Sequence, residues 1–240
     1  MFLTTWEWAE IVFNILYLIV IFSVVIYMYL ILRNRKDQSI ELEKIFADSF
    51  LLLAIGDLLL ILARILAYMM GGLDQTVKLF NFTVPFVGLG NLAQSITMTF
   101  FYILIMEVYR LKKEIKPGFL YFLVIGLGVI RLGIFFVPQN RWSDLNPPAD
   151  WVIIRNIPLV LMSLVAGLSF LLDSLKKKDL RFTWIAVLIM LPLAFYLPSQ
   201  LIEDIPEISL LMIPRSLCFL AALIVGFKAL KFTQKQAVKG

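Results

Sequence analysis

Five ionisable side chains interrupt otherwise apolar stretches of this sequence. They are one aspartate and four arginines: Asp57, Arg64, Arg131, Arg155 and Arg215. A charge inside such a stretch is costly to bury and is a candidate functional residue by default. Guanidinium groups bind carboxylate and phosphate groups through paired hydrogen bonds. The residue types therefore predict recognition of a small anion or a lipid headgroup.

The stretches that carry these charges are long enough to be membrane spans. Of the 240 residues, 61% are apolar and 16% are charged, and the mean hydropathy is +0.90, which is typical of a membrane protein. About 20 helical residues cross the roughly 30 Å of hydrocarbon in a bilayer. We expect an all-α, seven-transmembrane-helix bundle that forms a single membrane domain over residues 1–240. The expected spans are 8–32, 46–70, 80–109, 118–137, 151–173, 181–199 and 208–230.

The distribution of basic residues predicts the orientation of this bundle. Sixteen of the 22 lysines and arginines form four clusters, in the first, third and fifth loops and in the C-terminal tail. These are Arg33, Arg35, Lys36 and Lys44; Arg110, Lys112, Lys113 and Lys116; Lys176, Lys177, Lys178 and Arg181; and Lys228, Lys231, Lys235 and Lys239. The opposite side carries Lys78 and Arg141 against eight acids, which are Glu7, Glu10, Asp74, Asp144, Asp150, Glu203, Asp204 and Glu207. The positive-inside rule therefore predicts an outer N-terminus and a cytoplasmic C-terminus in a multi-pass protein of the cell membrane.

The four arginines are expected at one depth in the outer half of the bilayer. Each stands about four to eight residues inside its span, which is roughly 7–12 Å at 1.5 Å per residue. Two arrangements remain open. The guanidinium groups either converge on one outward-facing anionic pocket, or they extend separately to the interface and pair with loop acids.

Polar residues of the second and third spans complete the candidate site. Asp57 precedes Arg64 by two helical turns on the same face, and we expect it to be the counter-charge of that arginine. Asn91, Gln94 and Ser95 recur at helical spacing in the third span and share one face. We expect that face to point into the bundle, where Asn91 and Gln94 join the ligand-binding residues or hold helices together.

Several classes of function lack the residues that they need. Histidine is absent and Cys218 is the one cysteine, which excludes Ser-His-Asp or Cys-His catalysis, histidine-rich metal sites and a disulfide within the chain. We therefore expect neither an enzyme nor a cofactor. The net charge of +5 is explained by the flanks of membrane spans and predicts no binding of nucleic acid.

In size and predicted topology the chain resembles the microbial rhodopsins. That resemblance implies a retinal-bearing lysine in the middle of the last span, but residues 208–227 contain none, so no retinal is expected. The segment Leu53-Ala54-Ile55-Gly56-Asp57-Leu58-Leu59 is similar to the second-helix motif of rhodopsin-like G-protein-coupled receptors. The last span has no Asn-Pro-x-x-Tyr, and we assign the chain to neither family.

The sequence favours a receptor- or sensor-like protein that binds an anionic or lipid-headgroup ligand from the outer side. Because the loops are short, such a protein would act through a separate membrane or cytoplasmic partner. A secondary transporter of a small anion or lipid is one alternative, and an accessory subunit of a larger membrane complex is another. The polar residues thin out towards the cytoplasmic side, which favours the receptor-like interpretation over transport.

Overall fold

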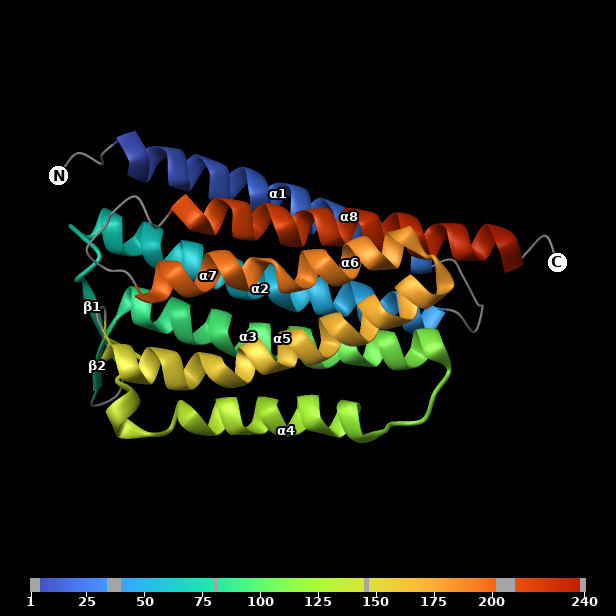
Figure 1. Cartoon of the computed structure of the whole chain (residues 1–240). Coiled ribbons are helices and arrows are strands. Elements are labelled where there is room, and N and C mark those ends of the chain that lie inside the picture. The colour runs from blue at the N-terminus through green and yellow to red at the C-terminus, as the bar shows by residue number, and fades with distance from the viewer. Residues whose placement is uncertain (1–4, 34–39, 80–81, 145–146, 202–209, 238–240) are drawn as a thin grey trace.

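The structure, a computed structural model, describes residues 5–33, 40–79, 82–144, 147–201 and 210–237. The long helices run side by side along one common direction (Figure 1). They are α1 (Thr5–Arg33), α2 (Ile40–Met69), α3 (Phe86–Lys113), α4 (Phe119–Ile134), α5 (Ala149–Lys177), α6 (Leu180–Met190), α7 (Pro192–Leu201) and α8 (Met212–Ala237). A short 3-10 turn, η1 (Pro138–Asn140), lies between α4 and α5.

The described helices are those of an integral, multi-pass membrane protein. Six spans are long and apolar enough to cross a bilayer, with α6 and α7 together forming one of them. The shorter α4 has 16 residues, or about 24 Å of helix, and is also apolar. Large apolar side chains cover much of the outer surface of the bundle, including Phe122, Ile130 and Leu172. These surfaces contact lipid, while the count of seven spans stays a prediction.

A β-hairpin precedes α3, and the sequence analysis did not foresee it. Strands β1 (Thr76–Leu79) and β2 (Phe82–Pro85) pair antiparallel, with Val77 opposite Val84. The expected start of the third span at residue 80 is therefore wrong, because the helix begins at Phe86. β-branched residues favour extended backbone, and a proline disfavours helix at the residue before it. Val84, which precedes Pro85, accordingly lies in β2, and Pro85 with its extended ψ of 140° is the N-cap of α3.

The bundle has two chemically different ends. The hairpin end holds β1 and β2 together with the beginnings of α1, α3, α5 and α8 (Figure 1). The opposite end, here called the basic end, carries the described lysine and arginine clusters at the ends of α3 and α5 and the start of α6. There Lys113 pairs with Asp173 at 3.0 Å and Lys112 with Asp179 at 3.3 Å, which joins α3 to α5 and to the cap of α6. Other residues used to predict orientation lie outside the described residues, namely Arg35, Lys36, Lys239, Glu203, Asp204 and Glu207.

Helices α2 and α3 form the most extensive helix contact, and two glycines permit it. A Cβ atom at Gly90 would lie 2.8 Å from the Cα atom of Leu60 and 2.9 Å from the Cβ atom of Ala63. A Cβ atom at Gly56 would lie 3.2 Å from the Cα atom of Gln94. Small residues at such positions let two membrane helices approach closely and gain packing and polar contacts.

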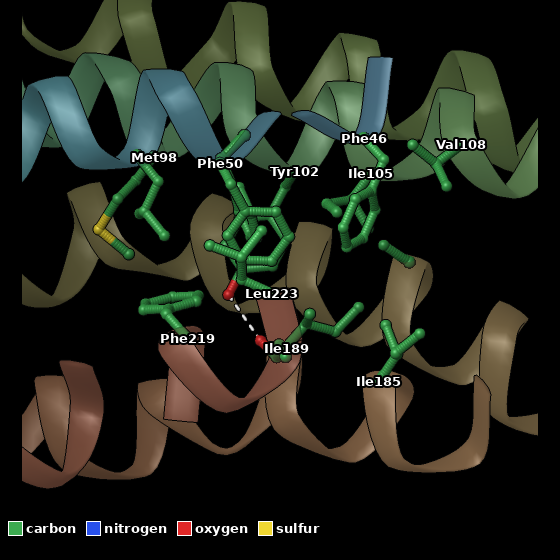
Figure 2. Packing of buried hydrophobic residues seen from close by; sticks show 14 of the residues in the cluster. Phe46, Phe50, Met98, Tyr102, Ile105, Val108, Ile185, Ile189, Phe219 and Leu223 are labelled. Atoms are coloured by element: carbon green, nitrogen blue, oxygen red, sulfur yellow. Dashed lines mark hydrogen bonds between the residues drawn. The ribbon is translucent and has the colours of Figure 1, made fainter. Parts of the chain in front are cut away.

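The basic half of the bundle is a packed core of aromatic and aliphatic side chains. Figure 2 shows Phe50, Tyr102 and Phe219 packed together with Ile105 and Leu223 between the helices. The ring centroid of Phe101 lies 5.3 Å from the ring centroid of Phe50 and 5.3 Å from that of Phe219, and both pairs have edge-to-face geometry. These side chains are almost fully buried and fill the space between α2, α3 and α8.

One polar contact in this core stabilises the break between α6 and α7. Pro192 removes a backbone donor and disrupts the preceding turn, so carbonyl groups near it need other partners. The carbonyl of Ile189 accepts a hydrogen bond from the Tyr102 hydroxyl at 2.8 Å and one from Ser163 at 3.4 Å. The first of these is drawn in Figure 2.

Replacing Tyr102 with phenylalanine is expected to lower the free energy of unfolding by about 0.5–1.5 kcal/mol, because the Ile189 carbonyl loses its shorter hydrogen bond. Thermal unfolding of the purified protein in detergent measures the effect. Tyr27→Phe is the matched control, since the Tyr27 side chain is 51% exposed on the outer surface of α1. Equal midpoints for the two variants would contradict the assigned role of the hydroxyl.

Candidate functional site

A buried polar network connects four helices in the half of the bundle nearer the hairpin end. Asp57 of α2 accepts hydrogen bonds from the Tyr17 hydroxyl of α1 at 2.9 Å and from the Gln94 amide of α3 at 2.7 Å. Its Oδ1 atom also lies 3.3 Å from Nη2 of Arg215 in α8. The side chains of Arg215 and Asp57 are 2% and 3% exposed, so this is a fully buried ion pair. We call these four residues the Asp57 network.

Aromatic rings and sulfur surround the remaining faces of the Arg215 guanidinium. Its Cζ atom lies 5.6 Å from the ring centroid of Tyr196 and 5.5 Å from that of Phe219, within cation–π range. Its Nη2 atom also donates to the sulfur of Met98 at 3.4 Å. The Arg215 Nε atom is one of three buried side-chain polar atoms without a partner in the described part of the chain.

The backbone around Asp57 explains why these groups can meet. Gly56 precedes the aspartate, and a Cβ atom there would lie 1.8 Å from Thr97 Oγ1. Without that atom α3 packs directly against α2, which brings the Gln94 side chain within reach of Asp57. A cavity of about 20 Å³ borders the network and is lined in part by Asn14 and Ser216. That volume accommodates about one water molecule and excludes an organic anion.

Arg64 lies at the rim of the same cavity and has a different acidic partner. Its Nη2 atom is 3.1 Å from a carboxylate oxygen of Glu10 in α1 and 3.5 Å from the Tyr68 hydroxyl. The expected pairing of Asp57 with Arg64 is therefore wrong. Two helical turns separate these residues by about 10 Å along the axis, and Arg215 approaches Asp57 from a neighbouring helix instead.

Arg131 has neutral acceptors in place of a carboxylate. It is 0% exposed, and its Nη1 atom donates to the Ser95 carbonyl and to the Thr99 hydroxyl, both at 2.8 Å. Its Nε atom donates to the backbone carbonyl of Arg155 at 3.3 Å. Gly128 lies one turn before Arg131, and a Cβ atom there would lie 3.3 Å from Thr99 Cγ2, so α4 approaches α3 closely at this level.

Arg155 completes a pair of neighbouring arginines, which we call the Arg131–Arg155 pair. Its side chain is half-buried, and its backbone carbonyl accepts the hydrogen bond from Arg131 Nε, so α5 meets α4 at this residue. Among the described residues no carboxylate lies within 4.0 Å of either guanidinium. Among the described residues, Arg64 and Arg215 therefore have acidic partners, whereas Arg131 and Arg155 have none.

The structure separates the predicted site residues into these groups. Arg215, Asp57 and Gln94 meet in one network, Arg64 lies beside it, and Arg131 and Arg155 lie together on α4 and α5. Asn91 is half-buried, and its side chain makes no hydrogen bond with a described residue.

Two residues that matter here escaped the sequence analysis as members of the site. Tyr17 was not singled out, because a tyrosine in an apolar helix is typical of core packing. Its position far inside its span, away from both interfaces, was the available signal. Thr99 was not assigned to the site, because its contact with Arg131 of α4 could not be inferred from spacing along one helix.

The apolar spans and the ion pair buried between them are those of an integral membrane protein. Its helices form a bundle with a partly charged interior. Comparison of the chain with known protein families, curated proteins and solved structures found no match.

Proposed function

We propose that this chain is a receptor- or sensor-like seven-helix protein that binds a small anionic or lipid-headgroup ligand at the Arg131–Arg155 pair. The observation that carries the proposal is the uncompensated charge of these two arginines among the described residues. Adjacent like charges in a membrane are unfavourable unless an anion compensates them. Arg155 is the accessible member because it is half-buried, and Arg131 contributes its charge from the interior.

The proposal places the hairpin end outside the cell and the basic end in the cytoplasm. Lysines and arginines at the ends of α3 and α5 support this orientation through the positive-inside rule. The Arg131–Arg155 pair lies near the end of α4 and the beginning of α5, which meet at the hairpin end. The ligand would therefore reach Arg155 from the outer side.

The packed core favours a receptor-like role over transport. Between the Asp57 network and the basic end, buried residues such as Phe50, Phe101 and Tyr102 fill the interior of the bundle. A transported anion would have to pass these apolar groups. Instead, a ligand bound near α4 and α5 can change the packing of helices, and the proposal assigns the response to a separate partner rather than to a catalytic reaction.

The proposal predicts that inorganic phosphate or sn-glycerol 3-phosphate stabilises the purified protein at constant ionic strength. A ligand at 100 times its dissociation constant adds about 2.7 kcal/mol of stability, or roughly 5–10 °C in midpoint for a chain of this size. Arg155→Gln and Arg131→Gln are each expected to abolish the shift. Thermal unfolding in a neutral detergent is the measurement.

Arg141→Gln is the matched control, because Arg141 is a solvent-exposed arginine of the same end that already pairs with Asp144 at 2.5 Å. It should keep the full response to phosphate. A thermal shift with phosphate that is retained in Arg155→Gln would contradict the proposed site. So would an unmodified protein that is stabilised neither by inorganic phosphate, nor by sn-glycerol 3-phosphate, nor by phosphatidic acid as the lipid-headgroup probe. In that case co-purification of a membrane chain that is lost in Arg155→Gln would identify an accessory subunit.

A further inference from the structure

An apolar pocket lies between α5 and α7, separate from the charged sites. It has a volume of about 210 Å³, and seven of its eight lining residues are apolar. The lining residues are Val152, Ile153, Asn156, Ile157, Val160, Leu161, Leu197 and Leu201. Ile153, Ile157 and Leu161 are also largely exposed on the surface of the bundle, so the pocket opens towards lipid.

Prolines in both helices account for a gap at this level. Pro158 lies within α5 directly after the lining residue Ile157, and Pro198 lies within α7 directly after Leu197. A proline inside a helix bends it and prevents continuous close packing against its neighbour. The two prolines therefore favour a gap between α5 and α7 at the level of the pocket.

The polar member of the lining has an unused hydrogen-bond acceptor. Asn156 is 2% exposed, and its Nδ2 atom donates to the Val152 carbonyl at 2.9 Å. A carbonyl can only accept, so this contact fixes the orientation of the amide. The Asn156 Oδ1 atom is then an acceptor, and it is buried without a partner in the described part of the chain. Buried acceptors normally have a donor, and one without a donor calls for an explanation.

We propose that this pocket binds a lipid alcohol, a neutral molecule whose hydroxyl group donates a hydrogen bond to Asn156 Oδ1 and whose apolar body contacts the surrounding aliphatic side chains. An ionised carboxylate would offer only acceptors to this oxygen, and an ester or ether likewise has no donor. A dry cavity of about 150 Å³ is enough for a benzene-sized molecule, so this pocket accommodates a ring or a short alkyl segment. The rest of the ligand would remain in the bilayer. This site is independent of the anion site proposed at Arg131 and Arg155.

The test compares 1-decanol with decyl methyl ether, which has a similar chain but no donor. The full-length protein is placed in nanodiscs of phosphatidylcholine, a lipid without hydroxyl or amine donors. We expect 1-decanol to raise the unfolding midpoint by about 2–4 °C more than the ether does. Asn156→Leu should remove this difference, because leucine offers no acceptor at a similar size.

A second variant keeps the test decisive if Asn156→Leu does not fold. Val160→Phe places an aromatic ring in the pocket and leaves Asn156 unchanged, so 1-decanol should raise the unfolding midpoint of this variant no more than decyl methyl ether does. Arg155→Gln should retain the response to 1-decanol, which separates this site from the proposed anion site. An equal response to alcohol and ether in the unmodified protein, or an alcohol response retained in Asn156→Leu or Val160→Phe, would overturn the proposal.

Discussion

Asp57→Asn should destabilise the protein by about 3–5 kcal/mol, because Arg215 then remains charged and buried without its carboxylate. For a chain of this size that loss corresponds to a decrease of roughly 6–20 °C in the unfolding midpoint. The substitution preserves the size of the side chain and leaves an amide that can still bond to Tyr17 and Gln94. The loss therefore reports the ion pair between α2 and α8. Thermal unfolding in detergent measures it.

A double-mutant cycle separates the ion pair from general damage to the core. Arg215→Met replaces the guanidinium with a flexible apolar side chain, and alone it leaves the Asp57 carboxylate without its cation. Combining it with Asp57→Asn removes both charges, and we expect the double variant to be more stable than either single variant. Additive losses in the double variant would show that the two groups are not coupled.

Gly90→Val should destabilise the protein by about 1–3 kcal/mol or more through overpacking of α2 against α3. The first side-chain carbon would lie 2.8 Å from the backbone of Leu60, and a backbone atom cannot rotate away. Gly90 is also one helical turn before Gln94, so separating the two helices would lengthen the bond from Gln94 to Asp57. Unfolding midpoints in detergent test the expected loss.

Gly126→Val is the matched control for this substitution. Gly126 also lies within an apolar helix, α4, but it is exposed and a Cβ atom there would have no neighbour within 4 Å. We expect a change within about 0.5 kcal/mol, as for other surface substitutions. A loss as large as that of Gly90→Val would mean that helix propensity, and not the α2–α3 contact, determines the result.

The sequence predicted the helices well because each is encoded locally. A run of apolar residues with basic residues at its end specifies a span and its limits, as for α5, expected at 151–173 and observed at Ala149–Lys177. The β-hairpin before α3 was missed because apolar β-branched residues such as Val77 and Val84 have the same hydropathy in a strand as in a span. Local extended geometry at Pro85, not hydropathy, determines where that helix begins.

The partners within the site were harder to predict, because they come from different helices. The presence of charges at Asp57, Arg64 and Arg215 was evident, but their pairing depends on which helices are neighbours. Asp57 pairs with Arg215, which is 158 positions away in the sequence, because the bundle brings the long side chain of Arg215 in α8 within reach of α2. Spacing along α2 alone suggested Arg64, which is bound by Glu10 of α1.

The most direct test of the proposed anion site is the anomalous diffraction signal of selenate in crystals of the purified protein. Selenate is a phosphate-like anion, and its signal locates the bound ion relative to individual arginines. We expect a peak within hydrogen-bond distance of the Arg155 guanidinium, on the side that faces Arg131, and none beside Arg215 or Arg64, which already have carboxylate partners. A strong peak at Arg215, or an acidic side chain bound to both Arg131 and Arg155, would contradict the assignment.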